Sequence, residues 1–69
     1  MNHDLALSLG ERIRHARLDR DVSQEKLALL TGIDRSYMGR IERGKVSMTI
    51  EKLYQIAQAL DIEPKELLP

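Results

Sequence analysis

Residues 23–44 read SQEKLALLTGIDRSYMGRIERG, and their order of capping and breaking residues predicts two short helices. Ser23 suits a helix N-cap, because its hydroxyl can accept a hydrogen bond from an unpaired amide in the next turn. Gly32 stands where the first helix must stop and the chain must turn. Asp34 is suited to be a second N-cap, and Gly44 a second stop. We therefore expect two helices joined by a tight turn, over 24–31 and 35–43.

Two short helices crossed at a steep angle form a rigid wedge whose second helix fits the DNA major groove. At roughly 100° per residue, Met38 and Ile41 share the side of the second helix that faces the core. Such helices contact bases mainly through their N-terminal residues, and the planar fork of arginine pairs with guanine O6 and N7. The residues expected to read bases are Arg35, Ser36 and Arg40. The residues expected to contact phosphate, near the far end, are Arg43 and Lys45.

The same segment resembles the helix-turn-helix of the phage repressor and Cro family, also called the xenobiotic-response-element family of bacterial regulators. The motifs that carry the likeness are LGERIR at 9–14, SQEKLA at 23–28, GI at 32–33, IERG at 41–44 and the run 53–60. The run 34–44 is similar to controller proteins of restriction–modification systems. The resemblance covers nearly the whole chain and implies an all-α, lambda-repressor-like DNA-binding domain.

The resemblance also implies roles outside the expected base-reading residues. Gln24 would contact phosphate and brace the recognition helix. Arg17 would pair with Glu42 beneath that helix as a structural brace, and the angular position of Glu42 on the core flank agrees. The angular map places Tyr37 on the flank of the same helix. There it either touches the sugar-phosphate backbone or a thymine methyl, or packs near Ile41.

Two positions depart from the family pattern. Asp21 and Asp61 stand where a glycine often ends the first and the fourth helix. Aspartate adopts a left-handed backbone more readily than most residues, so both turns can form, with some local strain. Neither departure touches the expected DNA face.

Hydrophobic spacing extends the prediction to a single domain over 1–69. We expect a first helix over 5–19, a fourth over 50–60 capped by Thr49, and a short final helix that begins at Pro64. The expected fold is therefore a compact five-helix domain around one core, without strands. The apolar stripes expected to form that core are Leu5, Leu9, Ile13 and Ala16; Leu27, Leu30 and Thr31; and Ile50, Leu53, Ile56, Ala57 and Leu60.

Length and charge limit the partners of the chain. Its 69 residues carry no net charge, but 23–48 holds five basic and three acidic residues, or +2, and 49–69 holds two and four, or −2. The positive part coincides with the expected DNA face. A domain this small is marginally stable, and without cysteine it has neither a disulfide nor a thiolate metal site, so we expect a dimer interface to stabilise it. The lack of a long apolar run or an export signal favours a cytoplasmic protein.

Apolar residues near the C-terminus have two readings: they cap the core of the monomer, or they also form a two-fold dimer interface with part of the fourth helix. These residues are Ile62, Leu67 and Leu68. Tyr54 either belongs to that interface or is a half-exposed surface residue. We favour the dimer, because it would place two recognition helices about 34 Å apart, one turn of DNA, and so read a palindrome.

The sequence gives no indication of catalysis or of a cofactor. His3 and His15 lie twelve residues apart without a cysteine or an i, i+4 partner, so both are expected to be solvated and not metal ligands. Asp19 and Asp21 sit in a probable turn, without a nearby constellation of histidine and serine that could build a nucleophile and base. We therefore expect neither an enzyme nor a metal site.

These patterns together predict a homodimeric transcription regulator that occupies a palindromic operator on double-stranded DNA and blocks or contacts polymerase. Two alternatives stay open. One is a DNA-binding antitoxin that neutralises a toxin through its termini or acidic tail. The other is a protein-interaction module that keeps the fold without binding DNA. The three outward arginines argue against the second alternative.

Overall fold

Four α-helices and one 3-10 turn follow one another along residues 2–69, the part of the chain that this computed structural model describes. They are α1 (His3–Asp19), α2 (Gln24–Thr31), α3 (Arg35–Glu42), α4 (Ile50–Ala59) and the 3-10 turn η1 (Pro64–Leu67). The all-α prediction is confirmed, but the expectation of a fifth helix is wrong. Pro64 begins the last element as expected, yet the element spans only four residues, a length that suits the shorter hydrogen-bonded ring of a 3-10 turn.

Side-chain caps set where the helices begin. α1 starts two residues earlier than expected, because the Asn2 side chain accepts a hydrogen bond from the Leu5 N–H at 2.8 Å. The expected caps of the next three helices are confirmed, since each accepts a hydrogen bond from an amide of the following turn. They are Ser23, Asp34 and Thr49. α4 ends at Ala59, one residue before the expected boundary.

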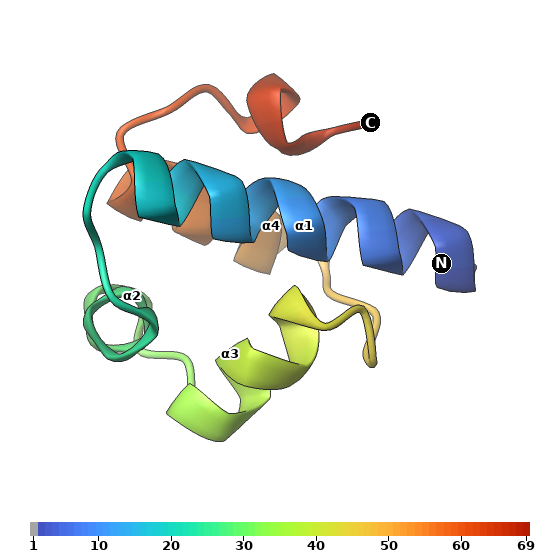
Figure 1. Ribbon diagram of the computed structural model, residues 1–69, viewed down its shortest axis with the longest axis horizontal. Helices are drawn as coiled ribbons and strands as arrows, with labels where there is room; N and C mark the ends of the chain where they lie inside the picture. The colour runs from blue at the N-terminus through green and yellow to red at the C-terminus, as the bar shows by residue number, and fades with distance from the viewer. Residues whose placement is uncertain (1) are drawn as a thin grey trace.

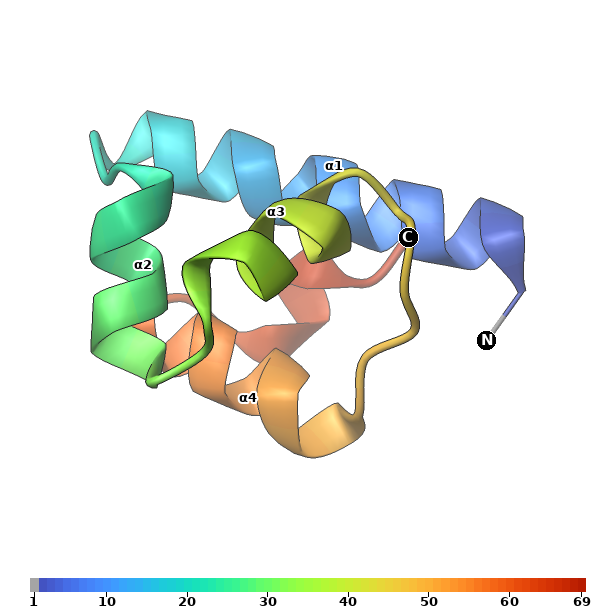
Figure 2. The same cartoon turned by 90° about the horizontal axis from the view of Figure 1, so that it is seen from below.

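α1 lies along the length of the molecule, with α3 on one side of it and η1 on the other (Figure 1). α2 runs across the end of α1, and α4 packs against α2 and η1. Seen from the side of α3, α1 and α4 flank that helix (Figure 2). No helix within residues 2–69 combines the length and the apolar character needed to cross a bilayer.

Apolar side chains from every element meet in one core. Those fully buried are Ile13, Leu27, Met38, Ile41, Ile56, Leu60 and Leu67. Three residues expected in this core are instead exposed: Leu5 at 36%, Leu30 at 51% and Ile50 at 70%. The buried face of α2 is centred between Leu27 and Ala28. Because successive helical residues are rotated by roughly 100°, Leu30 falls outside that face. Ile50, the first residue of α4, lies at the edge of that helix's buried stripe.

α1, α3 and α4 end in the same backbone motif. The second residue after the end of each helix has a left-handed φ: 57° at Asp21, 69° at Gly44 and 57° at Asp61. In each case the following N–H donates to a carbonyl five residues earlier, as in a Schellman motif. These bonds are Val22 to Arg17 (3.0 Å), Lys45 to Arg40 (2.9 Å) and Ile62 to Ala57 (3.0 Å). The expectation that aspartate supports a left-handed turn at both departures from the family pattern is confirmed.

Two glycines let α1 approach the end of α3 closely. A Cβ atom at Gly10 would lie 2.5 Å from the carbonyl oxygen of Ile41 and 2.6 Å from that of Glu42. A Cβ atom at Gly44 would lie 2.7 Å from the Cα of Leu7. All three are backbone atoms, which cannot rotate away as a side chain can. The C-terminal end of α3 is therefore held directly against α1, a contact that the sequence analysis did not foresee.

Candidate nucleic-acid interface

α3 presents one face to the core and the opposite face to solvent, as its angular map predicted. Met38 and Ile41 are buried, together with Gly39 and Glu42. The exposed residues of the helix and its C-terminal end are Arg35, Ser36, Arg40, Arg43 and Lys45. Figure 2, the view from the side of α3, shows this helix between α1 and α4. An exposed helix of this kind fits the width of the major groove.

The cations of this face are not neutralised within the protein. Among residues 2–69 the only ion pair within 4.0 Å joins Arg17 and Glu42. The guanidinium groups of Arg35, Arg40 and Arg43 and the ammonium of Lys45 therefore have no carboxylate partner in the described chain. Free positive charge on one face can attract and neutralise DNA phosphates even in a protein whose net charge is zero.

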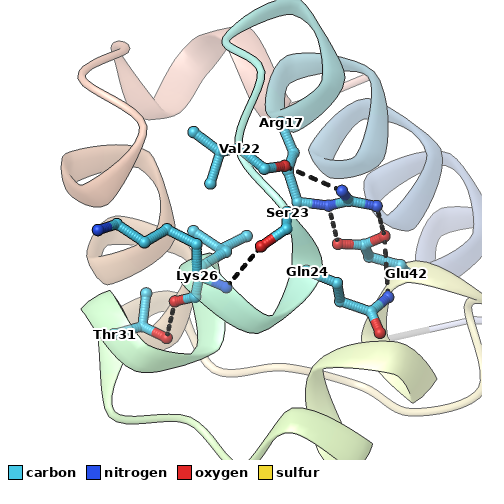
Figure 3. Close-up of polar contacts among 8 residues, drawn as sticks. Arg17, Val22, Ser23, Gln24, Lys26, Thr31 and Glu42 are labelled. Carbon is cyan, nitrogen blue, oxygen red and sulfur yellow. Dashed lines mark hydrogen bonds and ion pairs between the residues drawn. The ribbon is translucent and has the colours of Figure 1, made fainter.

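A buried ion pair supports the same helix from behind. Arg17 Nε donates to Glu42 Oε2 at 2.8 Å and Arg17 Nη2 donates to Glu42 Oε1 at 2.9 Å, which is a bidentate pair (Figure 3). Arg17 Nη1 also donates to the Val22 carbonyl at 3.0 Å. The hydrogen bond with Glu42 raises the pKa of Arg17 above its ordinary value. The guanidinium therefore keeps its charge at any pH where the protein is folded, and ties α1 to α3.

Gln24 extends this pair to α2. Its Nε2 donates to Glu42 Oε1 at 3.2 Å, so the first residue of α2 is bonded to the last residue of α3 (Figure 3). A Cβ atom at Gly39 would lie 3.4 Å from Gln24 Oε1 and 3.2 Å from an Arg43 nitrogen. A glycine inside α3 thus leaves room for both polar side chains beside the exposed face.

Comparison with known proteins agrees with this geometry. Residues 13–67 match the model of a protein family described as helix-turn-helix. The chain belongs to the helix-turn-helix family. It is a DNA-binding transcription regulator, and the resemblance predicted from its motifs is confirmed.

Several relatives of this helix-turn-helix regulator are controller proteins. It is 36% identical over 69 residues to Control protein C.BamHI of Bacillus amyloliquefaciens, covering 99% of the chain and 85% of that protein. It is 35% identical over 65 residues to Control protein C.SmaI of Serratia marcescens, covering 94% and 77%. The crystal structure of the restriction–modification controller protein C.AhdI from Aeromonas hydrophila matches with a TM-score of 0.88 and 44% identity, over 91% of this chain and 96% of that one. The narrower resemblance to controller proteins is therefore confirmed.

Tyr37 lies on the flank of α3 that faces the loop before α4. Its hydroxyl donates to the Ser47 carbonyl at 3.3 Å, and its half-buried ring packs against the core. Two cations lie against this ring, with Arg40 Cζ and Lys52 Nζ each 5.9 Å from its centroid. Sequence analysis of the regulator did not single out Lys52, because it lies outside the helix-turn-helix.

The residues expected at a dimer interface differ in exposure. Tyr54 is 58% exposed and Leu68 is 47% exposed, while Ile62 is half-buried against the core. Leu67 has no exposed surface. Its assignment to a dimer interface is therefore wrong, because the 3-10 turn points its side chain between α1 and α4 and into the monomer's own core. For Leu67 the alternative reading, a cap on that core, is the correct one.

The regulator's histidines are not gathered into a metal site. His3 and His15 are exposed on α1. Within residues 2–69 no three side chains of histidine, cysteine, aspartate or glutamate are grouped so that they could share a metal ion.

Proposed function

We propose that this helix-turn-helix regulator binds a palindromic DNA operator as a homodimer and controls transcription by occupying it. The observation that carries the proposal is the exposed, unneutralised cationic face of α3, which Arg17, Glu42 and Gln24 hold rigidly on the other helices. A preorganised reading helix loses little conformational freedom on binding. The proposal includes neither catalysis nor a cofactor.

Each exposed residue of this face has a proposed role. Arg35, Ser36 and Arg40 read base edges, since they lie on the N-terminal and central part of the outer face. Arg43 and Lys45, at the end of α3, contact phosphate. The second donor hydrogen of the Gln24 amide remains available for phosphate after the first is bound by Glu42. Tyr37 stands at the edge of the same surface, with its hydroxyl already bound to the protein.

The proposed dimer interface lies on the exposed side of α4 and the chain that follows it. Tyr54 is the most exposed aromatic residue, and Ile50 lies one turn before it on the same helix face. Leu68 and the half-buried Ile62 extend this apolar surface beyond α4. A two-fold axis through such a surface makes both copies use the same patch. The resulting symmetric dimer matches a palindromic DNA sequence.

The similarity to control proteins favours an operator beside the genes of a restriction–modification system. The experiment that tests the proposed function is selection of bound sequences from a randomised duplex pool at about 150 mM salt, which suppresses binding to phosphate alone. Enrichment of a palindrome supports a dimeric operator-binding regulator. Enrichment of a single half-site would argue against the dimer, and a folded sample that enriches no sequence would overturn the proposal.

Replacing Arg35 and Arg40 together with alanine is expected to weaken operator binding at least about 30-fold, because each arginine pair with a base contributes about 1–3 kcal/mol of discrimination. Folding should be unchanged, since both side chains are exposed. Titration of the selected operator by fluorescence anisotropy measures the loss. The control is a double variant, Arg12→Ala with Lys65→Ala, which removes two positive charges away from α3. Arg12 lies beside Ile62 and Glu66, on the side of α1 that faces η1. Equal affinity of the two variants would show that the base-reading residues are wrongly assigned.

A further inference from the structure

Lys52 occupies an unusual place for a basic residue. It is the third residue of α4, and its amide donates to the Thr49 cap at 3.1 Å. The first turn of a helix is the positive end of its dipole, where a lysine is disfavoured. The side chain is nevertheless half-buried, and it lines a groove between α4 and the turn that joins α2 to α3.

Lys52 has no ion pair within 4.0 Å in the described part of the chain. Asp34 lines the same groove, but its carboxylate accepts hydrogen bonds from the amides of Ser36 and Tyr37 at 3.1 and 3.3 Å and so belongs to the start of α3. Glu51 is adjacent in sequence, and adjacent helical residues do not face each other.

The ammonium lies instead against the ring of Tyr37, which also holds the Arg40 guanidinium. A tyrosine ring attracts a cation through its negative face. Arg40 and Lys52 each lie 5.9 Å from the centroid of this ring, so one tyrosine contacts a cation from each of two helices. The Tyr37 hydroxyl is bound to the Ser47 carbonyl, which fixes the ring relative to the loop between α3 and α4. The fixed ring therefore holds the Lys52 ammonium at the flank of α3.

We infer that Lys52 is part of the DNA-binding surface, as a contact to the phosphate backbone, and that Tyr37 is the residue that positions it. This inference rests on the proposed function, because it extends the same surface. α3 supplies the base readers, and Lys52 adds a phosphate contact from a helix outside the helix-turn-helix. Charge complementarity selects the occupant, since Lys52 adds an unpaired cation at the flank of the cationic face of α3, and DNA phosphates are anions.

Lys52→Gln keeps most of the stem of Lys52 and removes its charge. The slope of log affinity against log salt concentration is expected to become shallower by about 0.9. The affinity itself is expected to fall on the order of eightfold near 0.1 M salt. The selected base sequence should not change, because a phosphate contact carries no sequence information. Lys65→Gln is the matched control. It makes the same change of charge on η1, on the opposite side of α1 from α3 (Figure 1), and should leave the salt slope unaltered.

The role of Tyr37 is tested by combining substitutions. In a Tyr37→Leu background, Lys52→Gln should have little further effect on the salt slope, whereas in Tyr37→Phe, which keeps the ring, its effect should persist. Thermal unfolding of every variant separates a loss of folding from a loss of binding. Equal salt slopes for Lys52→Gln and Lys65→Gln would overturn the phosphate contact. An undiminished effect of Lys52→Gln in the Tyr37→Leu protein would overturn the positioning role. Both results are distinct from failure of the proposed function, in which the wild-type protein itself selects no operator.

Discussion

An Arg17→Met variant is expected to lose about 3–5 kcal/mol of folding free energy, because it leaves a buried carboxylate without its cation. Methionine keeps the apolar stem of Arg17 and removes the guanidinium, which donates two hydrogen bonds to Glu42 and one to the Val22 carbonyl. Glu42 is only 7% exposed, so water cannot replace those donors. Within residues 2–69 its side chain would keep only the hydrogen bond from Gln24.

Urea titration followed by far-ultraviolet circular dichroism measures this loss. Arg14→Met is the matched control, since it makes the same change at an exposed position of α1 and should cost less than about 0.5 kcal/mol. Combining Arg17→Met with Glu42→Leu removes both charges, and should recover most of the stability. A single Arg17→Met variant as stable as the Arg14→Met control would show that the pair does not brace the fold.

Gly10→Ala is expected to lower stability by about 3 kcal/mol, at the upper end of overpacking effects. The added methyl group would meet two backbone carbonyl oxygens at the end of α3, at 2.5 and 2.6 Å, so α1 and α3 must move apart. For a domain of this size the loss corresponds to a fall in Tm of roughly 12–24 °C. Differential scanning calorimetry measures it.

Gly39→Ala is the control for this second change. Both glycines lie inside helices, so both substitutions gain roughly 1 kcal/mol of helix propensity. At Gly39 the neighbours of the new Cβ atom are side-chain ends and not backbone: an Arg43 guanidinium nitrogen at 3.2 Å and Gln24 Oε1 at 3.4 Å. Gly39→Ala should therefore be at least as stable as the wild type. If the Gly10→Ala protein has the same Tm as the Gly39→Ala protein, α1 and α3 tolerate a wider separation.

Features that depend on neighbouring residues in sequence could be predicted. Ser23, Asp34 and Thr49 act as caps because each bonds an amide only two or three residues away. The division of α3 into a core face and an exposed face follows from helical spacing alone. The partnership of Arg17 with Glu42 came from the family resemblance, since twenty-five residues separate them and no local pattern joins them.

Features that depend on packing between elements could not be predicted. Leu67 and Leu68 are the same residue type in adjacent positions, and only the direction of η1 decides that the first is buried and the second exposed. Leu30 has the spacing of a core residue, but the short α2 turns Thr31 inward, where its hydroxyl donates to the Leu27 carbonyl at 2.8 Å. Gly10 and Lys52 carry no local signal, because their contacts lie on other helices.

The left-handed ends of α1 and α4 also bear on how such a regulator can evolve. Every aspartate codon becomes a glycine codon by one base change, and glycine adopts the φ of 57° found at Asp21 and Asp61 without strain. Each change would relieve strain on the order of 1 kcal/mol or less, in a domain whose total stability is only about 5 kcal/mol. Neither residue is among those proposed for the DNA face. A lineage can therefore stabilise the scaffold in one mutational step, and then tolerate a destabilising exchange among the proposed base-reading residues while its proposed operator changes.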